Sequence, residues 1–72
     1  MVKTKIKHII YPDGTEVFYK NGLLHRIGGP AVIFPNGTEI FYENGKRHRI
    51  GGPAIIHPDG RTEHWVNDKR QY

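Results

Sequence analysis

The chain repeats itself every 23 residues from Tyr11 onward, and this period constrains the fold more than any other feature. The segment Tyr-Pro-Asp-Gly-Thr-Glu at 11–16 returns as Phe-Pro-Asn-Gly-Thr-Glu at 34–39, and His-Arg-Ile-Gly-Gly-Pro-Ala at 25–31 returns unchanged at 48–54. A fixed period of this size is typical of repeat proteins in which neighbouring units share one core. The sequence therefore predicts one domain, 1–72, with a partial unit 1–10, repeats 11–33 and 34–56, and a partial capping repeat 57–72.

Each unit has the composition of β-strands separated by turns. Segments 15–19 and 38–42 are rich in β-branched and aromatic side chains, which favour strands. Asp-Gly or Asn-Gly pairs, which suit tight hairpin turns, recur at both ends of these segments. No segment has the apolar spacing of a helix. We therefore expect an all-β chain, an antiparallel meander of about six short strands arranged as stacked β-hairpins.

The faces of this sheet depend on the length of one turn. If 36–37, Asn-Gly, forms a two-residue turn, Ile33 faces Ile40 and their side is the predicted core. The opposite side then carries Phe34 and Phe41, which we assign to self-association, with a homodimer as the outcome. A turn of another length would exchange the two faces.

The two ends of the chain have the composition of caps. Lys3, Lys5 and Lys7 alternate along what should be the first edge strand, where charge discourages edge-to-edge aggregation. In the last unit, His57 and His64 stand where the second repeat has Phe34 and Phe41, which suits a terminal repeat without a neighbour. The alternative reading of the lysines is a basic contact surface.

Composition limits the classes of protein that the chain can belong to. The 72 residues include no cysteine, which excludes disulfides and thiolate metal sites and fits a reducing compartment. No apolar run approaches the roughly 20 residues that span a bilayer, and the N-terminal segment lacks the features of a signal peptide. We therefore expect a cytoplasmic chain. The net charge of +4 permits attraction to nucleic acid, anionic lipid or an acidic protein.

The histidines are the only candidates for metal or catalytic chemistry, and a structural role is favoured for each. His25 and His48 are equivalent in successive units, where a histidine more often packs or hydrogen-bonds a turn than binds a metal. His57 and His64 flank a turn with Glu63 nearby, so a chelate is the alternative to capping. The chain has no serine or cysteine nucleophile. We assign no catalytic residue, no metal site and no cofactor.

Basic residues beside aromatic rings form the best candidate for a binding surface. Leu24 of the first repeat is replaced by Arg47 and Arg70 in the later units, next to Tyr42 and Trp65. Arginine, tyrosine and tryptophan are typical anchors of protein interfaces, whereas cations beside rings also track a phosphate backbone. The third alternative is a solvated face on which arginine covers tyrosine. The predicted partner-binding residues are Tyr42, Lys46, Arg47, Arg49, Trp65, Lys69 and Arg70.

The unit that begins at Tyr42 resembles the MORN repeat. In segment 42–48 an aromatic residue precedes a turn glycine and a histidine, then come glycines, a strand and the Asp-Gly turn at 59–60, with the period of the family. The match covers the chain from His8 and is closest to MORN-variant repeats of bacterial and phage proteins, some of them antitoxin-like. The common unit has glycine where this chain has Val17 or Ile40 before the aromatic and Arg26 or Arg49 after the histidine.

The resemblance implies stacked β-hairpins and no catalysis. It suggests a small bacterial or phage protein that binds, and thereby inhibits, a protein partner. Electrostatic binding of nucleic acid or an anionic membrane surface through Lys46, Arg47, Arg49, Lys69 and Arg70 is the alternative.

Overall fold

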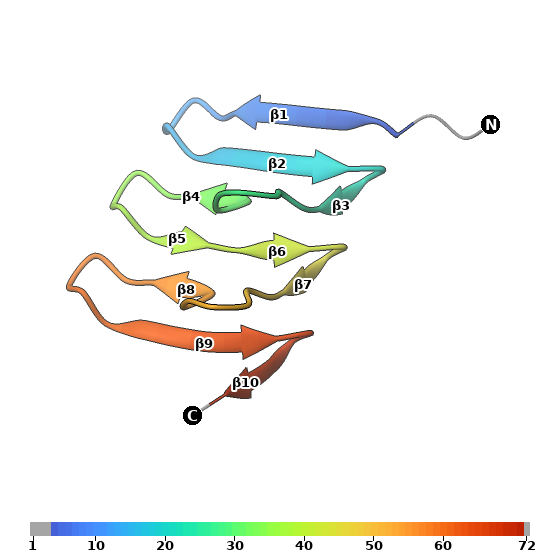
Figure 1. The fold of residues 1–72 in the computed structure, drawn as a ribbon. Helices are drawn as coiled ribbons and strands as arrows, with labels where there is room; N and C mark the ends of the chain where they lie inside the picture. The colour runs from blue at the N-terminus through green and yellow to red at the C-terminus, as the bar shows by residue number, and fades with distance from the viewer. Residues whose placement is uncertain (1–3, 72) are drawn as a thin grey trace.

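The computed structural model describes residues 4–71, so Lys3 lies outside its range. Within that range the chain is all-β and antiparallel, as the sequence predicts, and it contains no helix that could span a membrane. The strands lie one below another in a flat body of 41 × 29 × 16 Å (Figure 1). Their bounds are β1 (Ile6–Ile10), β2 (Glu16–Lys20), β3 (Leu23–Leu24), β4 (Val32–Ile33), β5 (Glu39–Ile40), β6 (Tyr42–Glu43), β7 (Lys46–Arg47), β8 (Ile55–Ile56), β9 (Thr62–Val66) and β10 (Lys69–Gln71).

The strands of the described chain form one large sheet and one separate pair. The eight-stranded sheet has the order β1-β2-β4-β5-β8-β9-β10, with β3 paired to β2, and β6 pairs only with β7. These strands are more numerous than expected because the short strands β3, β7 and β10 follow the turns at 21–22, 44–45 and 67–68, and because the segment equivalent to β2 is divided in the second repeat. There Phe41 separates β5 from β6 and donates its N–H to the Ala54 carbonyl oxygen, 2.7 Å away.

The turn between β4 and β5 is one residue longer than the Asn-Gly pair suggested. The Phe34 N–H donates to the Thr38 carbonyl oxygen at 2.9 Å, and the Gly37 N–H donates back to the Phe34 carbonyl oxygen at 3.0 Å. The loop therefore has three residues, 35–37. Gly37 has φ of 96°, and the Asn36 Oδ1 accepts a hydrogen bond from the Thr38 N–H at 2.9 Å. A three-residue loop ending in a left-handed glycine is the next most common hairpin connection.

This extra residue moves each side chain of β4 to the opposite face relative to the side chains of β5. The predicted pairing of Ile33 with Ile40 is therefore wrong. Val32 lies opposite Ile40. Because side chains alternate along a strand, Phe34 shares the face of Val32, whereas Phe41 points to the other face. Phe34 and Phe41 therefore do not form the single self-association face that we expected.

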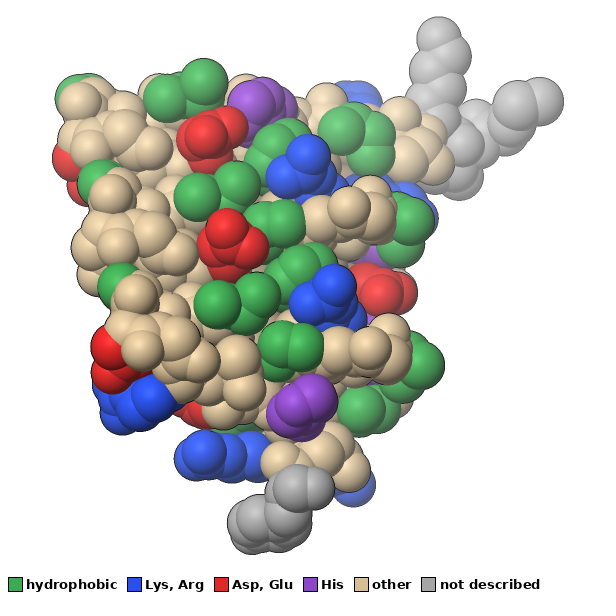
Figure 2. Space-filling model, turned by 60° about the vertical axis from the view of Figure 1, so that its left-hand side comes forward, with side chains coloured by type: hydrophobic (Ala, Val, Ile, Leu, Met, Phe, Trp, Pro, Cys, Tyr) green, Lys and Arg blue, Asp and Glu red, His purple; other side chains and the backbone are tan. Residues whose placement is uncertain are grey.

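Two faces can now be defined from the register. The aromatic face carries Tyr19, Tyr42 and Trp65 together with an apolar row of Val17, Val32, Ile40 and Ile55. The isoleucine face carries Ile10, Ile33 and Ile56 together with Phe18 and Phe41. Figure 2 shows hydrophobic side chains running down one face, with acidic and basic groups between them. The buried apolar residues are Val17, Val32 and Ile55 of the aromatic face, and Ala31 and Ala54, which are fully buried.

An arginine holds the irregular segment of each full repeat against the sheet. The Arg49 guanidinium carbon lies 4.0 Å from the centre of the Phe41 ring, and its Nη1 donates to the Pro53 carbonyl oxygen at 3.1 Å. Gly52 leaves the space for this guanidinium, because a Cβ there would lie 2.9 Å from the Arg49 Cζ. The same contacts recur one repeat earlier among Arg26, Phe18, Pro30 and Gly29. The repeated arginines are thus part of the fold.

The repeated histidines also stabilise the fold, as predicted. The Asn44 N–H donates to His25 Nδ1 at 2.9 Å, and the Asn67 N–H donates to His48 Nδ1 at 3.0 Å. Both asparagines have positive φ in the hairpin of the following unit. Each histidine therefore connects its own unit to the turn of the next unit by accepting a hydrogen bond at Nδ1. In the neutral ring, the N–H is then at Nε2.

Candidate binding surface

Four of the seven predicted partner-binding residues come together on the aromatic face. Tyr42 lies opposite Arg47 across β6 and β7, and Trp65 lies opposite Arg70 across β9 and β10. Cross-strand partners point to the same side of a sheet, so rings and guanidinium groups alternate down this end of the face. We call Tyr42, Arg47, Trp65 and Arg70 the ring–arginine ladder.

Arg47 is the most constrained member of the ladder. Its guanidinium carbon lies 3.9 Å from the centre of the Trp65 ring, and its Nε donates to Asp68 Oδ1 at 2.9 Å. The Arg47 N–H donates to the same oxygen, and the Asp68 N–H donates to the Arg47 carbonyl oxygen. The side chain nevertheless stays 36% exposed. Arg47 therefore presents a cation in a fixed position, joining the second repeat to the last unit.

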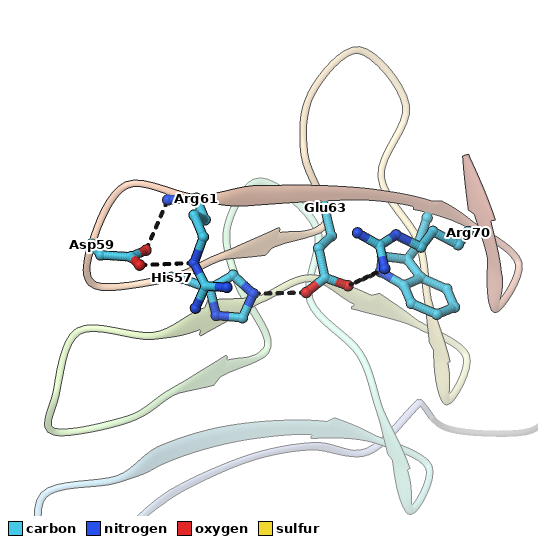
Figure 3. Close-up of polar contacts among 6 residues, drawn as sticks. His57, Asp59, Arg61, Glu63 and Arg70 are labelled. Atoms are coloured by element: carbon cyan, nitrogen blue, oxygen red, sulfur yellow. Dashed lines mark hydrogen bonds and ion pairs between the residues drawn. The ribbon is translucent and has the colours of Figure 1, made fainter. Parts of the chain in front are cut away.

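Glu63 fixes the other side of Trp65 and also binds His57, which points toward it in Figure 3. The Trp65 indole N–H donates to Glu63 Oε1 at 3.0 Å, and His57 Nε2 lies 2.7 Å from Glu63 Oε2. The Arg70 Nη1 is 4.0 Å from Glu63 Oε1. The hydrogen bond with His57, followed by that with Trp65, lowers the pKa of Glu63. The indole is thereby held in one orientation beside two arginines.

Sequence reasoning missed Glu63 and Asp68 as residues that organise the surface. Both mark places where the repeat changes: Glu63 stands where the earlier units have Val17 and Ile40, and Asp68 where they have glycine. The sequence signal for this role was an acidic residue at a position that is apolar or glycine in the earlier units, in a unit that also gains an arginine. The hydrogen bond from the Arg47 side chain is the largest cause that lowers the pKa of Asp68.

The other three predicted residues lie elsewhere. Lys46 and Lys69 are exposed at the ends of their hairpins, each next to a ladder arginine and on the opposite side of the strand. Arg49 lies over Phe41 on the isoleucine face. The cations predicted from the sequence to form one column therefore lie on two faces of the sheet, because side chains alternate along each strand.

The chelate considered for the last unit is not formed. His57 points to Glu63, whereas His64 is the neighbour of Glu63 in β9 and points to the other face. Among residues 4–71 there is no group of three or more side chains that could hold a metal ion. His57 instead serves to orient the carboxylate beside Trp65.

The carboxylates of this surface make stability fall in acid. The folded-state pKa values of Glu63 and Asp68 lie below their ordinary values of about 4. Their contribution is therefore complete above about pH 5 and is lost as pH falls through the folded-state pKa values. We expect the urea midpoint of the wild type to decrease from pH 5 downward, measured by fluorescence of the single tryptophan.

The matched variant for this prediction is Glu63→Gln, which retains the shape but cannot ionise. The difference in urea midpoint between wild type and this variant should shrink as pH falls. A difference that stays constant down to pH 2 would show that the Glu63 charge does not stabilise the fold.

No protein-family model, no curated protein and no solved structure matches the chain. Its function is therefore inferred from its own residues and geometry.

Proposed function

We propose that the chain is a non-enzymatic, MORN-like stack of β-hairpins that binds a protein partner through the ring–arginine ladder. We further propose that it is a small bacterial or phage protein of the cytoplasm whose binding inhibits that partner. The 23-residue period, with equivalent arginine and histidine contacts in successive units, supports the repeat architecture. The ladder supports the binding role.

The stacking of Arg47 on Trp65 is the observation that carries this proposal. Tryptophan, tyrosine and arginine dominate the binding energy of protein interfaces. Here the indole is held by Glu63 and the guanidinium by Asp68, so little side-chain freedom remains to be lost on binding. The ladder is therefore preorganised for a partner that supplies apolar contact to the rings and carboxylates to the arginines.

The remaining cations have different roles in this proposal. Lys46 and Lys69 are exposed next to the ladder arginines but on the opposite side of their strands, so in this proposal they raise the association rate with an acidic partner more than they raise affinity. Arg49 is left out of this contact because it lies over Phe41 on the isoleucine face, on the side of the sheet opposite the ladder.

Electrostatic binding of nucleic acid or an anionic membrane is the second candidate, favoured by the net charge of +4. It has a distinct signature, because affinity for DNA falls steeply as salt rises. Binding to DNA of arbitrary sequence that disappears with salt would support it. No binding at low salt would exclude it.

Arg70→Glu is the variant that tests the protein-binding proposal. The Arg70 side chain is 58% exposed, and its closest acid contact is the 4.0 Å approach to Glu63, so the change should leave the fold intact. We expect affinity capture from a host lysate, quantified by mass spectrometry, to lose the specific partner of the wild type by at least about tenfold, or about 1.4 kcal/mol.

Arg61→Glu is the matched control, since it makes the same change of charge. The Arg61 side chain is 75% exposed in the turn before β9 and pairs with Asp59. This variant should retain the partner. Equal capture by the wild type and both variants would contradict the ladder as the contact, and equal loss by both variants would point to net charge instead.

A further inference from the structure

The isoleucine face is the more exposed apolar surface of the molecule. Ile6 is 67% exposed, Ile10 64%, Ile27 73% and Ile50 74%. Ile6 and Ile10 point to this face from β1, and Ile27 and Ile50 line hollows together with Phe18 and Phe41. Water-exposed side chains of this size in rows, rather than singly, mark an interaction surface.

These hollows recur with the repeat. One of about 460 Å³ lies between Phe18 and Ile27, and one of about 430 Å³ lies between Phe41 and Ile50. A third, of about 450 Å³, lies between Ile50 and His64 of the last unit. Equivalent strands are two positions apart in the sheet, so the hollows follow one another at about 10 Å.

Two parallel columns of opposite sign stand out among the charged side chains on this face, which also carries Lys20, Glu43, Lys46 and Lys69 near the hairpin ends. Glu16 and Glu39 lie in the row of Ile33, and Arg26 and Arg49 lie over the phenylalanine rings of the next row. Figure 2 shows acidic and basic groups at successive levels with hydrophobic groups between them. In the described part of the chain, Glu39 and both arginines form no ion pair.

We propose that the isoleucine face binds a second copy of this chain, related by a twofold axis that runs along the direction of strand stacking. Rotation about such an axis exchanges the two columns and keeps every unit at its own level. Glu39 of one copy then faces Arg49 of the other, and Glu16 faces Arg26. The interface is isologous and closed, which gives a dimer.

A second copy fits this face for two reasons besides charge. Because the two copies are identical, their isoleucine rows and hollows have the same spacing of about 10 Å. The rows of one copy can therefore meet the hollows of the other in every unit. A face of 41 × 29 Å also exceeds the about 800 Å² per partner that a standard interface buries.

The fold also gains from such a contact. Among the described residues no large side chain is fully buried, and small domains commonly reinforce a small core by oligomerisation. The aromatic face remains free in this dimer, so the proposal does not depend on the proposed function.

Sedimentation equilibrium of the full chain tests this proposal. The wild type should reach twice its monomer mass of 8.3 kDa in the micromolar to millimolar range. Ile27→Glu combined with Ile50→Glu should keep it at 8.3 kDa over that range. Both residues are exposed, so circular dichroism should show an unchanged sheet.

A second variant tests the charge columns and removes no apolar contact. Glu39→Lys places a lysine opposite Arg49 of the other copy, so dimer dissociation should increase at least about tenfold. Phe34→Glu, on the aromatic face, is the control and should leave the dimer intact. If the double isoleucine variant unfolds, Glu39→Lys decides.

Three results would overturn the proposal: a monomer at every concentration, a dimer that survives in both test variants, or a dimer that Phe34→Glu alone dissociates. Loss of partner capture in a chain that still dimerises would contradict the proposed function and not this inference.

Discussion

Ala31→His should lower the free energy of unfolding by at least about 2 kcal/mol, even though histidine is the natural residue at the equivalent position of the first unit. Ala31 is fully buried, and its carbonyl oxygen accepts a hydrogen bond of 2.8 Å from the Phe18 N–H. An imidazole there would need space between the phenylalanine rows of two repeats and would bury a polar ring without a partner.

The equivalent residue His8 lies in β1, the first strand of the sheet, where this space is open. Its ring stacks on Phe18 with centroids 4.1 Å apart, and its side chain is 41% exposed. The same residue type is therefore accommodated at the edge and excluded one repeat further in. For a domain of this length the total stability is about 4–11 kcal/mol, so the loss in Ala31→His is a large share of it.

Urea unfolding followed by tryptophan fluorescence and circular dichroism measures this loss. The control is His8→Ala, which removes an exposed stack on Phe18 and the exposed contact of His8 Nε2 with Glu16 Oε1, and should cost less than about 1 kcal/mol. Equal losses in the two variants would show that position 31 is not packed as described.

The repeat was sufficient to predict an all-β antiparallel chain and the positions of its turns, but not the register. Asn36-Gly37 is compatible with a two-residue turn and with the last two positions of a three-residue loop. The choice depends on whether Phe34 or Pro35 pairs with Thr38, and proline lacks the N–H that must donate to the Thr38 carbonyl oxygen. One residue of difference then exchanged the faces.

The candidate surface was predicted only in part, because the register could not be predicted. Arg47 and Arg49 are close in sequence and were assigned to one contact, but they lie on opposite faces. Composition at single positions could not reveal that Arg49 packs on Phe41 or that Glu63 holds Trp65. Both contacts join residues that only the register brings together.

Removing the Arg49 side chain should cost about 2–3 kcal/mol of folding free energy. Arg49→Ala loses the stacking on Phe41, worth up to about 2 kcal/mol where the cation is desolvated. It also loses the hydrogen bond to the Pro53 carbonyl oxygen, a charged donor worth about 1.5–3 kcal/mol before the rest of the site relaxes.

Gly52→Ala provides an independent control on this contact. The added Cβ would lie 2.9 Å from the Arg49 guanidinium carbon, so the single variant should also be destabilised, by about 1–3 kcal/mol. In the Arg49→Ala background the clash is absent, and the second substitution should cost much less. Additive losses would contradict a direct contact, because only residues that touch show such coupling.

The central claim is that the repeated Arg49 stabilises the fold, whereas Arg70, which breaks the repeat, is left free for the contact with the protein partner. Urea unfolding of Arg49→Ala and Arg70→Ala, measured side by side, tests it most directly. We predict a loss of about 2–3 kcal/mol for the repeated Arg49 and less than about 0.5 kcal/mol for Arg70, whose side chain is 58% exposed. Equal losses, or a larger loss at Arg70, would contradict this division.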